Sequence, residues 1–132
     1  MRISILFGVA SFGLISNSIA ADWRMIIDDP RVTLEIDSSS IRKNANQFEA
    51  TFRFNHSENQ KSANGATYAS SEVTSLFNCE ERKYAPYKRI EFEGHKSTGA
   101  EVNHVLRVGS EIGFYDPAPG SMGKYMYASV CK

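Results

Sequence analysis

The sequence predicts an α+β domain: a single antiparallel β-sheet of about six strands with one C-terminal α-helix packed on one face. Between residues 21 and 108, short segments repeatedly alternate apolar and polar residues. Such alternation is typical of an antiparallel sheet with one packed and one solvated face. From Met122 onward the apolar residues Tyr125, Met126 and Val130 recur at helical spacing instead, and Ser121 can cap this helix.

The first 20 residues have the organisation of a signal peptide. Arg2 supplies a positive start, residues 3–15 are largely apolar, and Ser18-Ile19-Ala20 is a small-residue cleavage site. The apolar run is shorter than the roughly 20 residues that a membrane-spanning helix needs. We therefore predict export, with residues 21–132 as one mature domain that is periplasmic or secreted. The nearly balanced charge of the chain argues against nucleic acid or a membrane surface as partner.

Two cysteines, Cys79 and Cys131, are present. In an exported chain such a pair predicts one disulfide, with a single possible connectivity. The alternative is a pair of free or redox-active thiols. Catalytic dithiols usually have Cys-x-x-Cys spacing, whereas these cysteines lie far apart in the sequence. The predicted bond is structural, and it closes a loop long enough to stabilise the fold by about 4 kcal/mol in the chain-entropy model.

The alternation places strands at residues 21–28, 32–37, 47–55, 67–79, 83–93 and 101–108. In the third of these strands the phenylalanines Phe48, Phe52 and Phe54 are expected to be packed. Its polar residues Gln47, Glu49 and Arg53 are expected to be exposed.

Two segments between the strands are expected to be irregular. Residues 37–41 favour a tight turn or a single helical turn, because their side chains can bond their own backbone. Residues 56–66 lack periodicity and contain Asn64-Gly65, so an exposed loop is expected there. Simple alternation puts Tyr84, Ile90 and Phe92 on one face of the fifth strand. Pro86 within that strand predicts either a bulge or a free edge.

Several short motifs occur in a characteristic order along the mature chain: Asp22-Trp23, Ile36-Asp37, Ser39-Ser40-Ile41-Arg42, Asn78-Cys79, Arg82-Lys83-Tyr84, Pro119-Gly120-Ser121 and Val130-Cys131. This order, with both cysteines in place, resembles the surface-adhesin protein E family of small exported bacterial proteins. The resemblance implies a six-stranded sheet with the helix tied to its concave side by the disulfide. It also implies binding of host extracellular-matrix or plasma proteins. The family's namesake type carries a lipid anchor, but no cysteine lies near this cleavage site, which favours a soluble periplasmic or released protein.

No pattern in the sequence predicts catalysis, a cofactor or a metal site. His56, His95 and His104 do not have the spacing of shared metal ligands. No serine lies in a Gly-x-Ser-x-Gly motif. The protein is therefore predicted not to be an enzyme.

One segment combines cations with tyrosines, a composition enriched in protein-binding surfaces: Arg82, Lys83, Tyr84, Tyr87, Lys88 and Arg89. We call these residues the candidate segment. They predict contact with a protein partner, which the resemblance suggests is a host matrix protein, or a homodimer formed through a strand edge. The alternative is a solvated edge whose lysines prevent aggregation.

Three functions stay open at this stage. The first is an adhesin-like protein-binding module. The second is a periplasmic structural or stress protein of the envelope with no host ligand. The third is an inhibitor of a secreted hydrolase, which would use the loop at residues 61–65.

Overall fold

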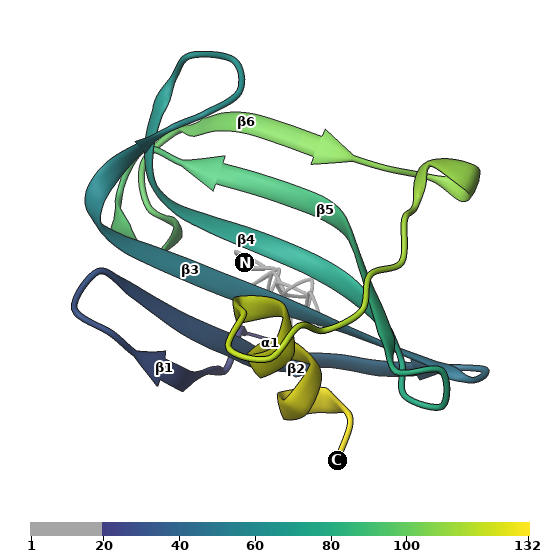
Figure 1. The fold of residues 1–132 in the computed structure, drawn as a ribbon. Coiled ribbons are helices and arrows are strands. Elements are labelled where there is room, and N and C mark those ends of the chain that lie inside the picture. Colours follow the sequence, from purple (N-terminus) through teal and green to yellow (C-terminus); the bar gives the residue numbers. More distant parts are fainter. Residues whose placement is uncertain (1–19) are drawn as a thin grey trace, which may run out of the picture.

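The computed structural model describes residues 20–132, and it confirms the predicted fold class. One six-stranded antiparallel sheet has its strands in the order of the chain, with α1 against one face (Figure 1). The strands are β1 Trp23–Asp28, β2 Val32–Asn44, β3 Gln47–Lys61, β4 Thr67–Asn78, β5 Lys83–Phe92 and β6 Glu101–Leu106; the helix α1 is Met122–Val130, and short 3-10 turns are η1 His95–Ser97 and η2 Gly109–Glu111. The predicted signal peptide lies, except for Ala20, outside the described residues.

The core lies between α1 and the face of the sheet that we call the inner face. Ser121 caps α1 as predicted, since its hydroxyl accepts a hydrogen bond from the Lys124 amide at 3.2 Å. From α1, Met126 and Tyr127 are buried against the sheet. The sheet side of the core consists of Leu34, Ile36, Ala50, Phe52, Val73 and Phe77.

The predicted disulfide between Cys79 and Cys131 is present. Cys79 follows β4 directly and Cys131 follows α1 directly, with 5.4 Å between their Cα atoms. Near the bond, the Tyr127 hydroxyl donates a hydrogen bond to the Cys79 carbonyl at 3.2 Å. The C-terminal end of the helix is therefore fixed to the end of a central strand.

The prediction of a turn at residues 37–41 is wrong, because β2 continues to Asn44. The side chains do bond locally, but they stabilise an irregularity in the pairing of β2 with β3. Ser39 donates to the Asp37 carboxylate at 2.6 Å, and the Ser40 hydroxyl accepts from the Thr51 amide of β3 at 2.8 Å. The strand thus accommodates its extra residues without leaving the sheet.

The loop predicted for residues 56–66 is also longer than the turn that the structure has there. β3 continues to Lys61 and pairs with the start of β4, leaving a tight turn at residues 62–66. Two contacts explain the extension: the His56 ring packs edge-on against Tyr68, at 5.9 Å between centroids, and Lys61 pairs with Thr67. Gly65 has φ +89° in this turn, which suits a glycine.

The predicted bulge in β5 is present, and it corrects the face assignment. Thr74 pairs with Lys88 and Ser75 with Pro86, so Tyr87 is the extra residue. A bulge of one residue reverses the side-chain alternation beyond it. Tyr84 consequently shares the inner face with Phe77, whereas Ile90 and Phe92 lie on the opposite, outer face.

Candidate functional site

The candidate segment does not form one continuous surface, because the bulge divides it. Arg82 lies in the β4–β5 turn with φ +55°, and it is exposed together with Lys83. Register places Tyr84 and Arg89 on the inner face and Lys88 on the outer face, opposite Thr74. Tyr84 and Arg89 therefore share the inner face of the sheet, and Lys88 lies on the opposite face.

Tyr87 points to the outer face, where its hydroxyl donates a short hydrogen bond to the Glu49 carboxylate of β3. Burial, the hydrogen bond and the charge of Glu49 raise the pKa of Tyr87 to about 12. Glu49, expected to be exposed, is half-buried as a result. This tyrosine therefore joins β5 to β3.

The expectation that β5 has a free edge is wrong. β5 lies between β4 and β6 in the sheet. Beyond the paired part of β6, the Arg107 amide donates to the Tyr87 carbonyl at 2.7 Å. Tyr84 exchanges two backbone hydrogen bonds with Tyr115, at 2.8 and 3.1 Å. Within residues 20–132, the sheet edges that no further strand covers are those of β1 and β6.

Arg89 is held in place by contacts from two strands. Its guanidinium group donates to the Tyr68 hydroxyl at 2.9 Å and to the Glu91 carboxylate at 3.3 Å. Glu91 is buried and also accepts hydrogen bonds from Ser62 at 2.6 Å and Asn103 at 2.8 Å. Burial alone would raise the pKa of Glu91, but these hydrogen bonds and the charge of Arg89 outweigh it and hold the pKa below its ordinary value.

Ser62 and Asn64 fix the tip of the β3–β4 hairpin. Ser62 is buried and bonded to Glu91, and Asn64 donates to the Val102 carbonyl of β6 at 2.8 Å. The segment expected to protrude as an inhibitory loop is therefore tied to β5 and β6.

Beside α1, the inner face contains a groove of about 400 Å³. Its floor and walls are mainly apolar, from Phe54 and Val73 of the sheet, Tyr115 of the β6–α1 connection and Met122 of the helix. We call it the inner-face groove, and Arg89 contributes to its wall. In Figure 1, α1 lies over the β2–β3 side of the sheet, and Gly123 of its first turn approaches the Tyr84 ring of β5.

The inner-face groove is cationic as well as apolar. Among the described residues, its lining includes Arg89 and Arg107 and no aspartate or glutamate; Lys88 also borders it, but register places the Lys88 side chain on the outer face. The described residues form no hydrogen bond or ion pair with the Arg107 guanidinium group, and Arg107 is exposed. Its charge is thus available to a ligand.

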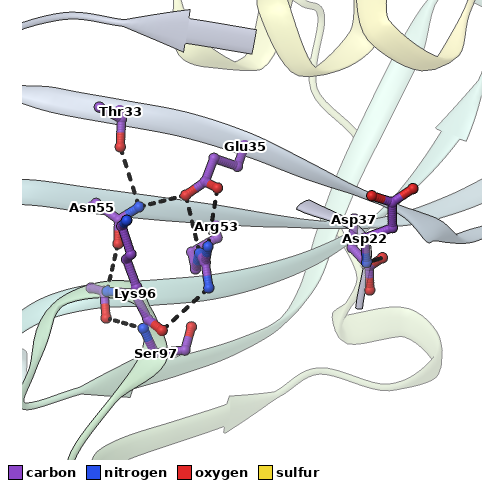
Figure 2. Close-up of polar contacts among 9 residues, drawn as sticks. Asp22, Thr33, Glu35, Asp37, Arg53, Asn55, Lys96 and Ser97 are labelled. Carbon is purple, nitrogen blue, oxygen red and sulfur yellow. Dashed lines mark hydrogen bonds and ion pairs between the residues drawn. The ribbon is translucent and has the colours of Figure 1, made fainter. Parts of the chain in front are cut away.

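A polar network occupies the outer face (Figure 2). Arg53 forms two parallel hydrogen bonds with the Glu35 carboxylate, at 3.0 and 3.1 Å, and both side chains are only 10% exposed. Asn55 donates to the same carboxylate at 2.6 Å, and the Lys96 carbonyl of η1 accepts from Arg53 at 3.2 Å. The Trp23 ring covers the guanidinium group at 4.3 Å. The expectation that Arg53 is exposed is therefore wrong.

Asp22 and Asp37 are at the right of Figure 2, and their side chains fix the first residues of the described chain. The Asp22 amide donates to the Asp37 carboxylate at 2.9 Å, and Ser38 donates to the Asp22 carboxylate at 2.7 Å. The bonds from Ser38 and Arg24 lower the pKa of Asp22. The carboxylates of Glu35, Asp37 and Asp22 thus have partners within the protein, and we place the candidate site on the inner face.

Within residues 20–132, no group of three His, Cys, Asp or Glu side chains is arranged to hold a metal ion. His95 bonds the His56 carbonyl at 2.9 Å, and His104 is an exposed residue of β6. No helix in this part of the chain is both long and apolar enough to cross a membrane.

Fold and site together define a small one-sheet protein with a cationic, apolar groove beside a disulfide-anchored helix. Residues 23–132 match the family model described as surface-adhesin protein E, and the chain belongs to this family. Membership places it among surface or exported proteins and confirms the predicted resemblance. No individually curated protein matches the sequence.

Solved structures of Haemophilus influenzae protein E are similar to this chain. Crystal form II has a TM-score of 0.62 at 10% identity, with 86% of this chain and 89% of that chain covered. Protein E from non-typeable Haemophilus influenzae has a TM-score of 0.59 at 11% identity, with 87% and 78% covered. At these identities the likeness establishes a shared fold.

Proposed function

We propose that this chain is an exported, non-enzymatic protein-binding module of the adhesin type, with a host matrix or plasma protein as partner. The observation that carries the proposal is the family match over residues 23–132. The exposed cations at the β4–β5 turn and the cationic groove support it, because such charges can steer an acidic partner protein to the surface.

The candidate segment contributes to the contact in two places. Arg82 and Lys83 are exposed in the turn, next to the exposed Glu80 and Glu81. Tyr84 and Arg89 present an aromatic ring and a fixed cation to the inner face. Tyrosine and arginine are the residue types that most often supply the binding energy of protein interfaces.

The test is binding of the purified exported protein to immobilised matrix extract and to plasma proteins, by surface plasmon resonance. We expect specific binding that weakens as salt rises, since exposed charges are screened over about 8 Å at physiological ionic strength. Lys83→Glu should reduce binding. Lys61→Glu is the matched control, because it reverses the charge of an exposed lysine at the opposite end of the sheet.

Equal binding by the two variants would remove the β4–β5 turn from the contact surface. Failure of the wild-type protein to bind any matrix or plasma component would contradict the proposed function itself.

A further inference from the structure

The inner-face groove has a composition that selects a particular partner chemistry. Two cationic residues of its lining, Arg89 and Arg107, are available on the inner side of the sheet, and none of the described lining residues is acidic. The acidic residue nearest in the sequence, Glu91, is buried beneath Ser62, Asn103 and Arg89. Glu91 is paired with Arg89 at 3.3 Å, whereas the described residues form no ion pair with Arg107, so the uncompensated positive charge of the groove is that of Arg107.

Arg89 is fixed before any ligand arrives. Two guanidinium nitrogens bond Glu91 and one of these also bonds Tyr68, while the described residues make no bond to the third nitrogen. The side chain is still 39% exposed. An arginine held in this way keeps donors for a carboxylate and loses little conformational freedom on binding.

The apolar part of the groove lies next to this cation. Phe54, Val73 and Met122 line it together with the rings of Tyr84 and Tyr115. A volume of about 400 Å³ is of the size that ligand pockets commonly have. One large apolar side chain of a partner can be buried there while an adjacent carboxylate reaches the arginines.

Arg107 supplies a second cation from the connection that follows β6. It lines the same groove, is exposed, and is positioned by the backbone hydrogen bond from its amide to the Tyr87 carbonyl. Because Arg89 and Arg107 come from neighbouring segments, both can contact one carboxylate.

We propose that the inner-face groove binds a partner segment in which an acidic residue is adjacent to a large apolar side chain. The carboxylate pairs with Arg89 and Arg107, and the apolar side chain packs on Phe54, Val73 and Met122. This inference rests on the proposed protein-binding function and assigns it a site and a sequence preference.

The experiment is an NMR titration of the ¹⁵N-labelled exported protein with blocked tetrapeptides. The probe has aspartate followed by phenylalanine between two glycines; the matched probes replace aspartate by asparagine or phenylalanine by alanine. We expect the first probe to shift the amide signals of Val73, Arg89 and Val105. Each matched probe should bind about tenfold more weakly, because it lacks the charge-assisted bonds or the buried ring.

Variants test Arg107 and the groove wall without disturbing the buried pair of Arg89 and Glu91. Arg107→Gln should weaken the first probe about tenfold, and Val105→Glu should do the same by adding a negative charge to the wall. Lys61→Gln is the control: it removes an exposed cation that does not line the groove, and binding should not change.

Absence of shifts with the first probe at millimolar concentration would overturn the proposal, as would equal binding of the asparagine probe. Shifts confined to residues outside the groove would overturn it too. Binding of dodecanoate in the groove without any response to the peptides would assign the site to a small amphiphile instead. Binding of the whole protein to matrix or plasma components is measured separately from these peptide titrations. This proposal can therefore fail while the proposed function stands.

Discussion

Replacing Arg53 by alanine should destabilise this protein strongly, although alternation along β3 places the residue on the solvated face. Its guanidinium group forms two hydrogen bonds with the Glu35 carboxylate, and both side chains are 10% exposed. Truncation leaves that carboxylate buried with Asn55 as its main remaining donor. Removing one partner of a buried ion pair typically costs about 3–5 kcal/mol.

Replacing both partners separates the loss of the pair from the cost of an unpaired charge. The variant Arg53→Met with Glu35→Leu keeps similar volumes and buries no charge. We expect it to unfold with a free energy within about 1 kcal/mol of wild type, or to be more stable, because the pair no longer has to be desolvated. Glu35→Gln alone should be intermediate, since an amide can still accept from Arg53.

The assay is urea denaturation followed by fluorescence of Trp23, the single tryptophan, whose ring covers Arg53 at 4.3 Å. The free energies of Arg53→Met, Glu35→Leu and the double variant, compared with wild type, form a cycle that isolates the coupling. A change within about 0.5 kcal/mol for Arg53→Ala, as for an ordinary surface position, would refute the reasoning.

Three further predictions concern the core, the helix and pH. Phe52→Ala should lower the free energy of unfolding by about 3–5 kcal/mol in the same assay, because the ring is fully buried and packs edge-on against Phe77; a loss below about 1 kcal/mol would contradict this. Gly123→Ala should cost about 1–3 kcal/mol despite the better helix propensity of alanine, because a Cβ there overlaps the Tyr84 phenol; a stabilised variant would show that this contact is loose. Glu91→Gln should be less stable than wild type at pH 7, with the difference shrinking as the pH falls below about 4.5. The folded pKa of Glu91 lies below its unfolded value, so its stabilisation is present above that value and lost as the pH falls through the folded pKa; a pH-independent difference would be contrary evidence.

The six antiparallel strands and the disulfide could be predicted from the sequence because both depend on local pattern or simple counting. Phe48, Phe52 and Phe54 identify the inner face of β3, and two cysteines in an exported chain allow one bond. Ser121 likewise marks the start of α1 by its capping chemistry.

Arg53 could not be assigned correctly because its burial depends on segments distant in the chain. Alternation does place Arg53 and Glu35 on the outer face, and strand pairing sets them opposite each other. What encloses them is the Trp23 ring and the η1 carbonyl of Lys96, neither of which follows from the pattern of β3.

The faces of the candidate segment also depend on contacts with other parts of the chain. Its composition predicts contact residues, and Pro86 predicts the bulge, which is present. The position of the extra residue, Tyr87, decides which side chains share a face, and that position depends on pairing with β4. The inner-face groove was missed altogether, because Arg107 and Met122 approach β5 only through the β6–α1 connection.

The central claim is that this family member binds matrix or plasma proteins from outside the cell. The most direct test compares adherence to immobilised matrix extract of cells that produce the protein, cells that lack it, and cells that produce the Lys83→Glu variant. Digestion of the protein by protease added to intact cells is measured in parallel. We predict reduced adherence without the protein, partial adherence with the variant, and digestion on intact cells. Equal adherence of all three strains, with the protein protected from protease, would contradict the claim.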